Sequence, residues 1–345
     1  MRVAVWGTLG IVYLLGLALP AASHTLRVPS EYPTIKAGLD SASYGDTVLV
    51  APGTYVTNDA RDTWIRPGPG VVLVGEAGRD ETFIEVCNRS YGVELYECEG
   101  ARVSGFTVRL VVNDSCGPTM GFSYGVDCLE CTDVVIENCC FENLSFGVRV
   151  EGQSDAWYRP IIRSNIISGG RSGVGCFNVH DPGRPLIEGN IITDCFWGAE
   201  VWNSAPDFDD NEITYCHDGL YYLGACGGNC AGNVIAHNEE CGAYVNTTPP
   251  LASPWFNGGW ALEDANDFYD NGTWDIWYAH SGPDALIMAT HNYWGRMCPD
   301  FTTKIHGRVN YSPWTDSTHA TLIEEDDCPN ATEPATWSSI KALFR

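Results

Sequence analysis

A short phrase repeats along the middle of the chain, and its period limits the folds that the chain can adopt. From residue 134 onward an asparagine is followed, eight or nine residues later, by a glycine that opens an apolar segment. The repeated asparagines are Asn138, Asn165, Asn190, Asn211 and Asn233, which lie 27, 25, 21 and 22 residues apart. A period of roughly 20–30 residues with turn residues at constant offsets indicates a solenoid.

The segment after each glycine predicts a β-strand. Val148 and Val150 share one parity while Arg149 takes the other, and the same alternation returns in the following copies. A period of two places one set of side chains inside and the other outside. No segment between the copies is long and periodic enough to be a crossover helix, which excludes a doubly wound α/β sheet. The sequence therefore predicts an all-β fold, a single-stranded parallel β-helix of about ten coils in which every coil adds one strand to each sheet.

Two columns of side chains are expected inside this coil. The five asparagines are predicted to stack, because each amide can bridge to the same position one coil above and below and satisfy backbone groups at a tight corner. Five residues further on, Asn143, Cys195, Cys216 and Asn238 predict a second column. Cys195 and Cys216 would then lie about one strand spacing, ~4.8 Å, apart. A disulfide and a pair of packed thiols both remain open for them.

Less regular strands are expected before the repeat. They cover Asp46–Val50, Val71–Val74, Thr82–Val86, Tyr91–Tyr96, Arg102–Leu110 and Tyr124–Leu129. Residues 33–42 break the pattern, because Ile35, Gly38, Leu39 and Ala42 fall at i, i+3, i+4 and i+7 behind Pro33. This spacing predicts a short amphipathic helix that caps the open end of the coil, where unpaired backbone edges would favour aggregation.

The two ends of the chain differ from the repeat. Residues 1–23 are predicted to be a cleaved signal peptide, with Arg2, an apolar stretch and small residues at 21–23. No other stretch of about 20 apolar residues occurs, so no membrane span is expected after cleavage. Residues 24–315 form the predicted β-helix domain. Residues 316–345 are predicted to be an acidic linker and tail, and the sequence leaves open whether the tail docks, directs sorting or caps the last coil.

Cysteine content and charge restrict the compartment and the partners. All 15 cysteines follow the signal segment, which in a secreted chain indicates an oxidising compartment with some disulfides. Cys226 and Cys230 are predicted to close a short loop through a disulfide. Acidic residues outnumber basic ones 44 to 19, for a formal charge of −25. Nucleic acid and anionic membranes are not expected as partners on this basis, since phosphates require a basic face. A neutral, cationic or calcium-bridged ligand fits the charge better.

Two segments outside the repeat carry a family resemblance. Residues 28–55, from Val-Pro-Ser-Glu-Tyr-Pro to Ala-Pro-Gly-Thr-Tyr, resemble the opening module of pectinesterase-like proteins. The Asn-Tyr-Trp-Gly of 292–295 and the segment 309–314 resemble the closing coil of NosD-like surface proteins. Together with the repeat, about residues 25–315 resemble a right-handed parallel β-helix of the pectin-lyase-like superfamily. That superfamily includes lyases, hydrolases, esterases, epimerases and binding modules, so the fold alone does not choose an activity.

The outward strand positions and the loops beside them supply a candidate binding site. Glu200, Trp202, Tyr221, Tyr244 and Trp255 are predicted to bind substrate. Sugar faces stack on aromatic rings while sugar hydroxyls bond to carboxylates, and nine of the twelve tryptophans lie beyond residue 190. The alternative for each ring is a buried or corner-packing role.

Catalytic candidates are few. Arg149, His180, Asp181 and Arg184 offer a base and a cationic group that would stabilise negative charge. A turn around Pro182 explains the last three without any chemistry. No pectinesterase set of aspartate and arginine follows the opening module. No lysine lies between residues 37 and 303, which excludes a lysine base on the central coils.

Calcium is the one cofactor that the sequence suggests. Asp207 and Asp209 offer the hard oxygen ligands that calcium prefers, and strand alternation predicts that they share a face. A solvated acidic loop is the alternative. No other cofactor is expected.

The leading hypothesis is a secreted, cell-surface or periplasmic protein, monomeric, that binds polysaccharide or a cell-surface glycan on an outer sheet. The first alternative is a lyase or glycoside hydrolase acting on uronate-containing polymers. The second is a structural envelope protein without a ligand.

Overall fold

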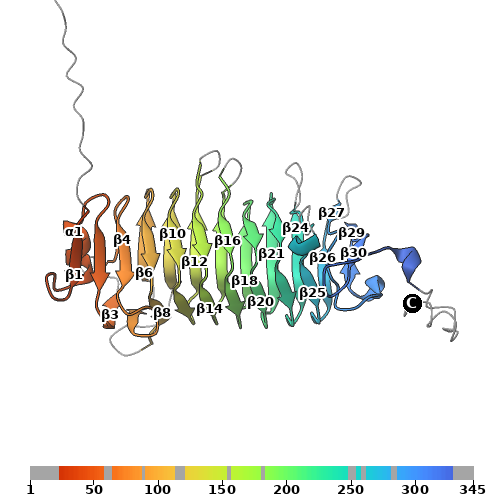
Figure 1. Cartoon of the computed structure of the whole chain (residues 1–345), viewed down its shortest axis with the longest axis horizontal. Coiled ribbons are helices and arrows are strands. Elements are labelled where there is room, and N and C mark those ends of the chain that lie inside the picture. The colour runs from red at the N-terminus through yellow and green to blue at the C-terminus, as the bar shows by residue number, and fades with distance from the viewer. Residues whose placement is uncertain are drawn as a thin grey trace, which may run out of the picture.

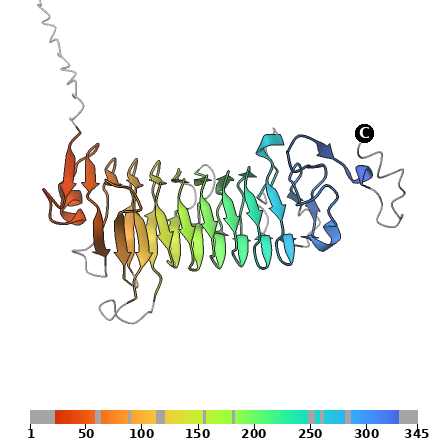
Figure 2. The same ribbon diagram turned by 60° about the horizontal axis from the view of Figure 1, so that its bottom comes forward.

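The chain winds into a column of stacked coils with three faces. The structure, a computed structural model, describes residues 23–57, 64–87, 90–112, 121–153, 157–179, 183–247, 254–257, 262–280 and 286–328. Within them each coil contributes one strand to each of three nine-stranded parallel sheets. Figures 1 and 2 show the coils following one another along a single axis. The predicted parallel β-helix is confirmed.

The three sheets take their strands in turn along the chain. Sheet A consists of β1 (Thr25–Val28), β2 (Thr47–Val50), β4 (Val72–Gly75), β7 (Arg102–Ser104), β10 (Val135–Glu137), β13 (Ile161–Arg163), β16 (Leu186–Glu188), β19 (Asp207–Asp209) and β22 (Cys230–Ala231). Sheet B consists of β3 (Gly53–Thr57), β5 (Thr82–Val86), β8 (Thr107–Leu110), β11 (Cys140–Glu142), β14 (Ile166–Ser168), β17 (Ile191–Thr193), β20 (Glu212–Thr214), β23 (Val234–Ala236) and β25 (Asp267–Tyr269). Sheet C consists of β6 (Tyr91–Tyr96), β9 (Tyr124–Leu129), β12 (Phe146–Glu151), β15 (Ser172–Phe177), β18 (Trp197–Trp202), β21 (Asp218–Gly224), β24 (Cys241–Thr247), β26 (Trp274–Tyr278) and β28 (Ile305–His306).

Strand alternation forms the core as predicted. In sheet C, Val148, Val174 and Ala199 occupy the same register position in successive coils and are fully buried. Leu220 and Ala243 continue this column. Burying a valine or leucine side chain contributes about 1.5–3 kcal/mol, so each coil is stabilised by the apolar residues it stacks on its neighbours.

An asparagine column runs along the corner between sheets A and B. The side-chain nitrogen of Asn190 donates to Oδ1 of Asn211 at 3.0 Å, and that of Asn211 donates to Oδ1 of Asn233 at 2.9 Å. Asn165 precedes them in the same arrangement, and Asn266 and Asn292, which the repeat did not reveal, follow. These amides are buried, and each Oδ1 also accepts the backbone N–H of the coil before. The column therefore satisfies polar groups that the corner removes from water.

One predicted member of that column is wrong. Asn138 is exposed and has a φ of 52°, whereas Cys139 occupies the column position and donates its backbone N–H to Asn165. The register pairs Glu137 with Arg163, so Asn138 aligns with Ser164, which is left-handed at φ 55°. Asparagine tolerates that conformation better than most residues. Asn138 is therefore the turn residue that directly precedes the column position.

The second predicted column lies between sheets B and C and also needs a correction. Cys195, Cys216 and Asn238 stack as expected, and Asn271 continues the column by accepting from the side chain of Asn238 at 2.9 Å. The prediction for Asn143 is wrong by one residue. Asn143 is exposed with a φ of 55°, and the buried Leu144 follows it.

The predicted disulfide between Cys226 and Cys230 is wrong, and Cys195 and Cys216 follow the packed-thiol alternative. All four are free thiols in the interior. Cys195 and Cys216 occupy equivalent positions of neighbouring coils, which direct their side chains the same way. The sulfurs of all four cysteines lie against carbonyl oxygens or a tyrosine hydroxyl of their surroundings.

The repeat glycine has a steric explanation. A Cβ atom on Gly198 would lie 2.5 Å from the carbonyl oxygen of Gly219, and one on Gly219 would lie 2.5 Å from that of Gly242. Real Cβ atoms do not approach oxygen so closely. These glycines are the second residues of β18 and β21, where successive coils come together at a position that only glycine fits.

The two ends of the column are closed differently. Helix α1 (Ile35–Ser41) begins after Thr34, whose hydroxyl accepts the N–H of Ala37, and it buries Ile35 and Leu39 against the first coils. The predicted capping helix is thereby confirmed, with slightly shorter bounds. The other end carries the short pairs β27 (Ile287–Met288) with β29 (Val309–Asn310) and β30 (Trp314–Thr315) with β31 (Leu322–Ile323), together with the 3-10 turns η3 (Leu262–Asp264), η4 (Phe301–Thr303) and η5 (Glu325–Asp327).

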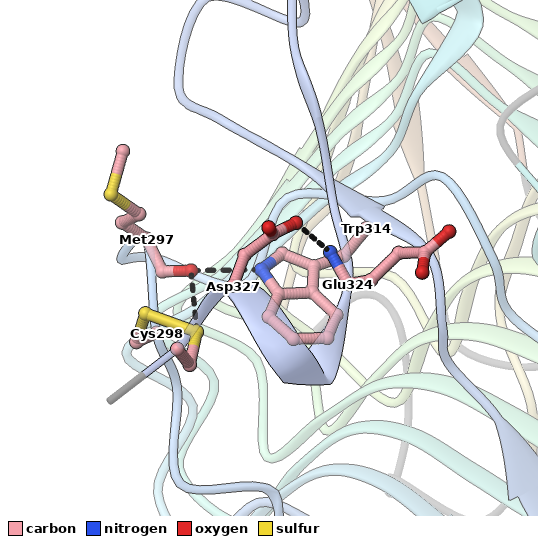
Figure 3. Close-up of a disulfide and its surroundings, with 6 residues drawn as sticks. Met297, Cys298, Trp314, Glu324 and Asp327 are labelled. Atoms are coloured by element: carbon pink, nitrogen blue, oxygen red, sulfur yellow. Dashed lines mark hydrogen bonds between the residues drawn. A yellow bond between two sulfur atoms is a disulfide. The ribbon is translucent and has the colours of Figure 1, made fainter. Parts of the chain in front are cut away.

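The C-terminal cap extends past the predicted domain boundary at 315. Cys298 and Cys328 form a disulfide, and the indole nitrogen of Trp314 donates to the carbonyl oxygen of Met297 at 2.8 Å (Figure 3). Ile323 is buried against the cap. Residues 316–328, predicted as the start of a linker, are therefore part of the folded end. Residues 1–22 and 329–345 lie outside the described residues.

The asparagine column gives a stability prediction. Replacing Asn211 by alanine would leave the backbone N–H of Asn190 and the carbonyl oxygen of Ile187 without their partners. A buried unsatisfied polar group costs about 1–3 kcal/mol, so Asn211→Ala should lower the free energy of unfolding by roughly 3 kcal/mol in chemical denaturation. Asn229→Ala, at an exposed asparagine, is the control and should change little. Equal effects of the two variants would contradict the proposed role of the column.

Candidate functional site

The outer face of sheet C presents a row of side chains, one from each coil. The register aligns the middle outward position of successive strands, and its character changes along the axis. The row reads Glu94, Asp127, Arg149, Gly175, Glu200, Tyr221, Tyr244, Trp277 and His306. Charged residues occupy the earlier coils and aromatic rings the later ones.

A groove of about 470 Å³ opens where the charged part of the row meets the aromatic part. Its lining consists of Phe122, Tyr124, Phe146, Arg149, Glu151, Arg171, Phe177, Asn178, Glu200, Trp202 and Asn203. Gly175 stands between Arg149 and Glu200 in the row and has no side chain to fill the gap. A Cβ there would lie 2.6 Å from the ring of Phe177. The rings of Phe146 and Phe177, which line the groove, take the place of the missing side chain.

Arg149 is held by an ion pair across two coils. Its Nε and Nη2 donate to the two carboxylate oxygens of Asp127 at 2.6 and 2.9 Å, and its guanidinium lies 4.5 Å from the ring centre of Tyr124. Burial acts against the charge of Arg149, but the bond to Asp127 outweighs it and raises the pKa of the guanidinium. Burial also raises the pKa of Asp127, against the pull of Arg149. Arg149 therefore stays protonated and cannot serve as a base.

Glu200 is the buried carboxyl of the groove. Its two oxygens accept from Nη2 of Arg171 at 3.0 Å and from the hydroxyl of Ser172 at 2.8 Å. Desolvation raises its pKa, while Ser172 and Arg171 act in the opposite direction. Arg171 in turn lies 4.8 Å from the ring centre of Trp197 and 5.2 Å from that of Phe146. Such contacts suit a cation, because ring faces carry partial negative charge.

An aromatic platform continues the row toward the C-terminal end. The ring centres of Trp197 and Tyr221 are 4.7 Å apart, those of Tyr221 and Tyr244 are 5.0 Å apart, and those of Tyr244 and Trp277 are 5.5 Å apart. Trp202 projects beside them and is 49% exposed. Trp197, Tyr221 and Tyr244 stack on one another with interplanar angles of 24° and 10°, and Trp277 is turned by 64° against Tyr244. One ring per coil thus forms a continuous aromatic row at about the strand spacing. We call Trp197, Tyr221, Tyr244 and Trp277 the aromatic platform.

Five of the predicted site residues meet on this face. Arg149, Glu200 and Trp202 line the groove, and Tyr221 and Tyr244 form part of the platform. Their common face follows from the alternation that the sequence displayed.

The other predicted site residues lie elsewhere. Trp255 pairs with Asn229 and Met288 beside the C-terminal end of sheet A. Arg184 bonds to Asp207 at 3.1 Å on the outer side of the same sheet. The structure therefore separates these residues from the groove, while His180 and Asp181 lie outside the described residues.

Sequence reasoning missed Arg171 and the rings of Phe122, Phe146 and Phe177. Arg171 comes just before a strand and reaches across a coil to Glu200, which no local pattern indicates. Phe146 precedes the repeat glycine, and a comparison of this position between copies would have revealed it, because Trp197 stands there two coils later. Alternation can be seen within one strand. The alignment of residues on neighbouring coils can be predicted only by comparing copies of the repeat.

The acidic residues proposed for calcium do share a face, on the outer side of sheet A. Asp207 and Asp209 flank the buried Phe208, as alternation predicts. Asp207 is already engaged by Arg184 and by the backbone N–H of Asn229 at 2.9 Å. Desolvation, followed by the nearby charges of Asp207 and other acids, raises the pKa of Asp209 to about 6.

Comparison with protein families gives one match. The family described as "Periplasmic copper-binding protein (NosD)" matches residues 39–271, which is more than half of the 345 residues. The chain belongs to the NosD family. Among the residues that the structure describes, no three histidine, cysteine, aspartate or glutamate side chains are grouped so that they could hold a metal ion. The copper of the family description thus has no ligand set in this part of the chain.

Several solved structures are similar to this NosD family member, and one of them, with a TM-score above 0.5, supports its fold. The pectate lyase Pel9A matches with a TM-score of 0.55 at 11% identity, over 86% of this chain and 80% of that one. The A-module of the mannuronan C-5 epimerase AlgE4 from Azotobacter vinelandii matches with a TM-score of 0.46 at 16% identity, over 72% and 67%. The catalytic domain of a GH87 α-1,3-glucanase matches with a TM-score of 0.40 at 12% identity, over 85% and 59%. These likenesses concern the fold alone. No curated protein matches the sequence.

No helix in the described part of the chain is long and apolar enough to cross a membrane.

The raised pKa of Asp209 predicts how stability depends on pH. The folded state holds the proton of Asp209 more tightly than the unfolded state does. The contribution of this proton to the free energy of unfolding is therefore present below pH 4 and is lost as the pH rises through about 6. Asp209→Asn should therefore raise the melting temperature at pH 7 and leave it nearly unchanged at pH 4, as measured by circular dichroism.

Asp316 provides a control, because its pKa is shifted in the opposite direction. Its bond to the Thr318 hydroxyl, together with backbone N–H groups, lowers its pKa to about 2. Stabilisation by this carboxylate is present above pH 3.8 and is lost as the pH falls toward 2. Asp316→Asn should lower the melting temperature at pH 7. The same direction of change in both variants would contradict the assignment.

Proposed function

We propose that this protein binds polysaccharide along the outer face of sheet C. The observation that carries the proposal is the aromatic platform, which offers one ring per coil at 4.7–5.5 Å between neighbouring centres. Sugar faces stack on aromatic rings through their C–H bonds. A polymer lying parallel to the axis of the column would repeat the same contact from coil to coil, and each added contact would increase its affinity.

The groove complements the platform with polar groups. Glu151 lines the groove with a side chain that is 40% exposed, and Asn178 and Asn203 line it as well. Carboxylate and amide oxygens accept hydrogen bonds from sugar hydroxyls. The groove is the natural place for one end of the bound segment to be recognised, while the platform supplies contact area.

We also propose that the protein works as a monomer outside the cytoplasm, secreted, on the cell surface or in the periplasm. The description of its family as periplasmic and the predicted signal peptide support this location. The titles of several structures with a similar fold name enzymes that act on polysaccharides, which is consistent with a glycan as partner.

Removing the exposed ring of Trp202 together with the half-buried ring of Tyr221 tests the binding site. An aromatic contact contributes about 1 kcal/mol, so Trp202→Ala combined with Tyr221→Ala should weaken polysaccharide binding roughly 30-fold. The measurement is isothermal titration of the full chain with a panel of soluble polysaccharides. Tyr44→Ala, at an exposed tyrosine near the N-terminal end, is the matched control and should bind normally. Unchanged binding by the double variant would remove the platform as the site.

Cleavage of the bound polymer is a second candidate function, favoured by Glu200. Its carboxyl lies at the groove, paired with Arg171 and Ser172, and carboxyl groups are among the side chains that transfer protons in catalysis. If the protein forms new reducing ends in a polysaccharide, Glu200→Gln should reduce that rate at least a hundredfold, as expected for a general acid, and leave binding within a few-fold. Arg184→Ala, on sheet A, should not change the rate. Full activity of Glu200→Gln would exclude this role.

A further inference from the structure

Two buried thiols lie on either side of one corner of the column. Cys128 is the last inward-facing residue of β9, in register with the buried Leu95, and it is 0% exposed. Leu129 and Glu130 turn the chain out of sheet C, with Glu130 in the left-handed region at a φ of 54°. Cys131 follows the turn and is 1% exposed. The C-x-x-C spacing therefore places both sulfurs in the interior, at the two ends of a tight turn.

The two thiols are bonded to one another, unlike the predicted pair of Cys226 and Cys230. The hydrogen bond between the side chains of Cys128 and Cys131 is the main influence on both groups: it raises the pKa of the Cys128 thiol and lowers that of the Cys131 thiol. A disulfide requires two side chains that converge, and these two already do. Cys131 forms a thiolate more readily than Cys128, and the thiolate is the nucleophile in disulfide chemistry.

Cys98 is a competing thiol in the same corner, one coil earlier. The backbone N–H of Thr132 donates to the carbonyl oxygen of Cys98 at 3.0 Å, and Glu99 pairs with Thr132, so Cys98 is aligned with Cys131. Aligned residues of adjacent coils direct their side chains the same way. The sulfur of Cys98, which is 2% exposed, accordingly bonds to the carbonyl oxygen of Pro67 at 3.7 Å. Cys98 thus matches Cys131 in position and burial but is engaged elsewhere.

We infer that Cys128 and Cys131 form an internal disulfide when the chain folds in the presence of a small disulfide such as oxidised glutathione. The Cys131 thiolate attacks one sulfur of this reagent, which produces a mixed disulfide and releases the first reagent thiol. The Cys128 sulfur then attacks the Cys131 sulfur, and the second reagent thiol leaves. The two protein thiols lose two protons and two electrons, and the reagent disulfide becomes two thiols. This exchange precedes closure of the coils, because both sulfurs are buried in the finished column.

Peptide mapping of the full chain tests the inference. The chain is produced in an oxidising secretory compartment, unfolded without reduction and treated with an alkylating reagent. A protease that cleaves after glutamate separates Cys128 from Cys131 at Glu130, so that only a disulfide holds their two peptides together. We expect mass spectrometry to find the linked peptides in most molecules, separated by reduction, and an alkylated Cys98. Alkylation of both Cys128 and Cys131 in most molecules before reduction would overturn the inference.

Two matched variants identify the partner of Cys131. Cys98→Ser removes the competing thiol and should leave the fraction of linked Cys128 and Cys131 peptides unchanged. Cys128→Ser should leave Cys131 as an alkylated thiol or as the mixed disulfide with glutathione, which is the first intermediate of the exchange. A link between Cys98 and Cys131 in the unmodified sequence, or loss of the Cys128–Cys131 link in Cys98→Ser, would overturn the assignment. If a variant does not fold, the map of the unmodified sequence decides alone among the three cysteines.

Discussion

Register between successive coils is the constraint on which the rest of this structure depends. Backbone hydrogen bonds join each strand to the equivalent strand of the next coil, so a residue lies directly over its counterpart. The arrangement holds only if the corners also stack. Asparagine side chains bonded to one another keep one corner, and glycines in contact with the next coil's carbonyl oxygen keep another. With both corners fixed, the direction of every side chain on the three sheets follows.

The same register creates the candidate site. A change of residue type from one coil to the next appears on the surface as a change along a straight row, from Arg149 through Gly175 to Glu200 and Tyr221. Ion pairs also cross coils, as between Arg149 and Asp127, because charged residues of opposite sign occupy neighbouring places in the row. The rings of Phe146 and Phe177 lie over the glycine and line the groove, and the rings beyond it form the platform. The shape and the chemistry of the groove and of the platform therefore depend on the order of residues in this row.

Much of this could be predicted from the sequence, and the errors have physical causes. The period identified the solenoid, and alternation identified which of Glu200, Tyr221 and Val201 face outward. Asn138 was assigned to the wrong column because asparagine suits both the buried position and the left-handed turn residue before it. The pairing of Arg171 with Glu200 could not be predicted, since it depends on the path of a long side chain between coils. The disulfide prediction for Cys226 failed because spacing along the chain says nothing about the direction of the sulfur atom.

The corner glycines have a consequence for how proteins of this kind change length. Gly198 lies against the carbonyl of Gly219, and Gly219 lies against that of Gly242, so these coils meet their neighbours at equivalent positions. A whole coil gained or lost by duplication or deletion would leave both seams continuous. A shorter insertion inside a strand would displace one corner relative to its neighbours. Evolution of such a chain should therefore proceed in complete turns, with partial insertions confined to the loops that leave the sheets.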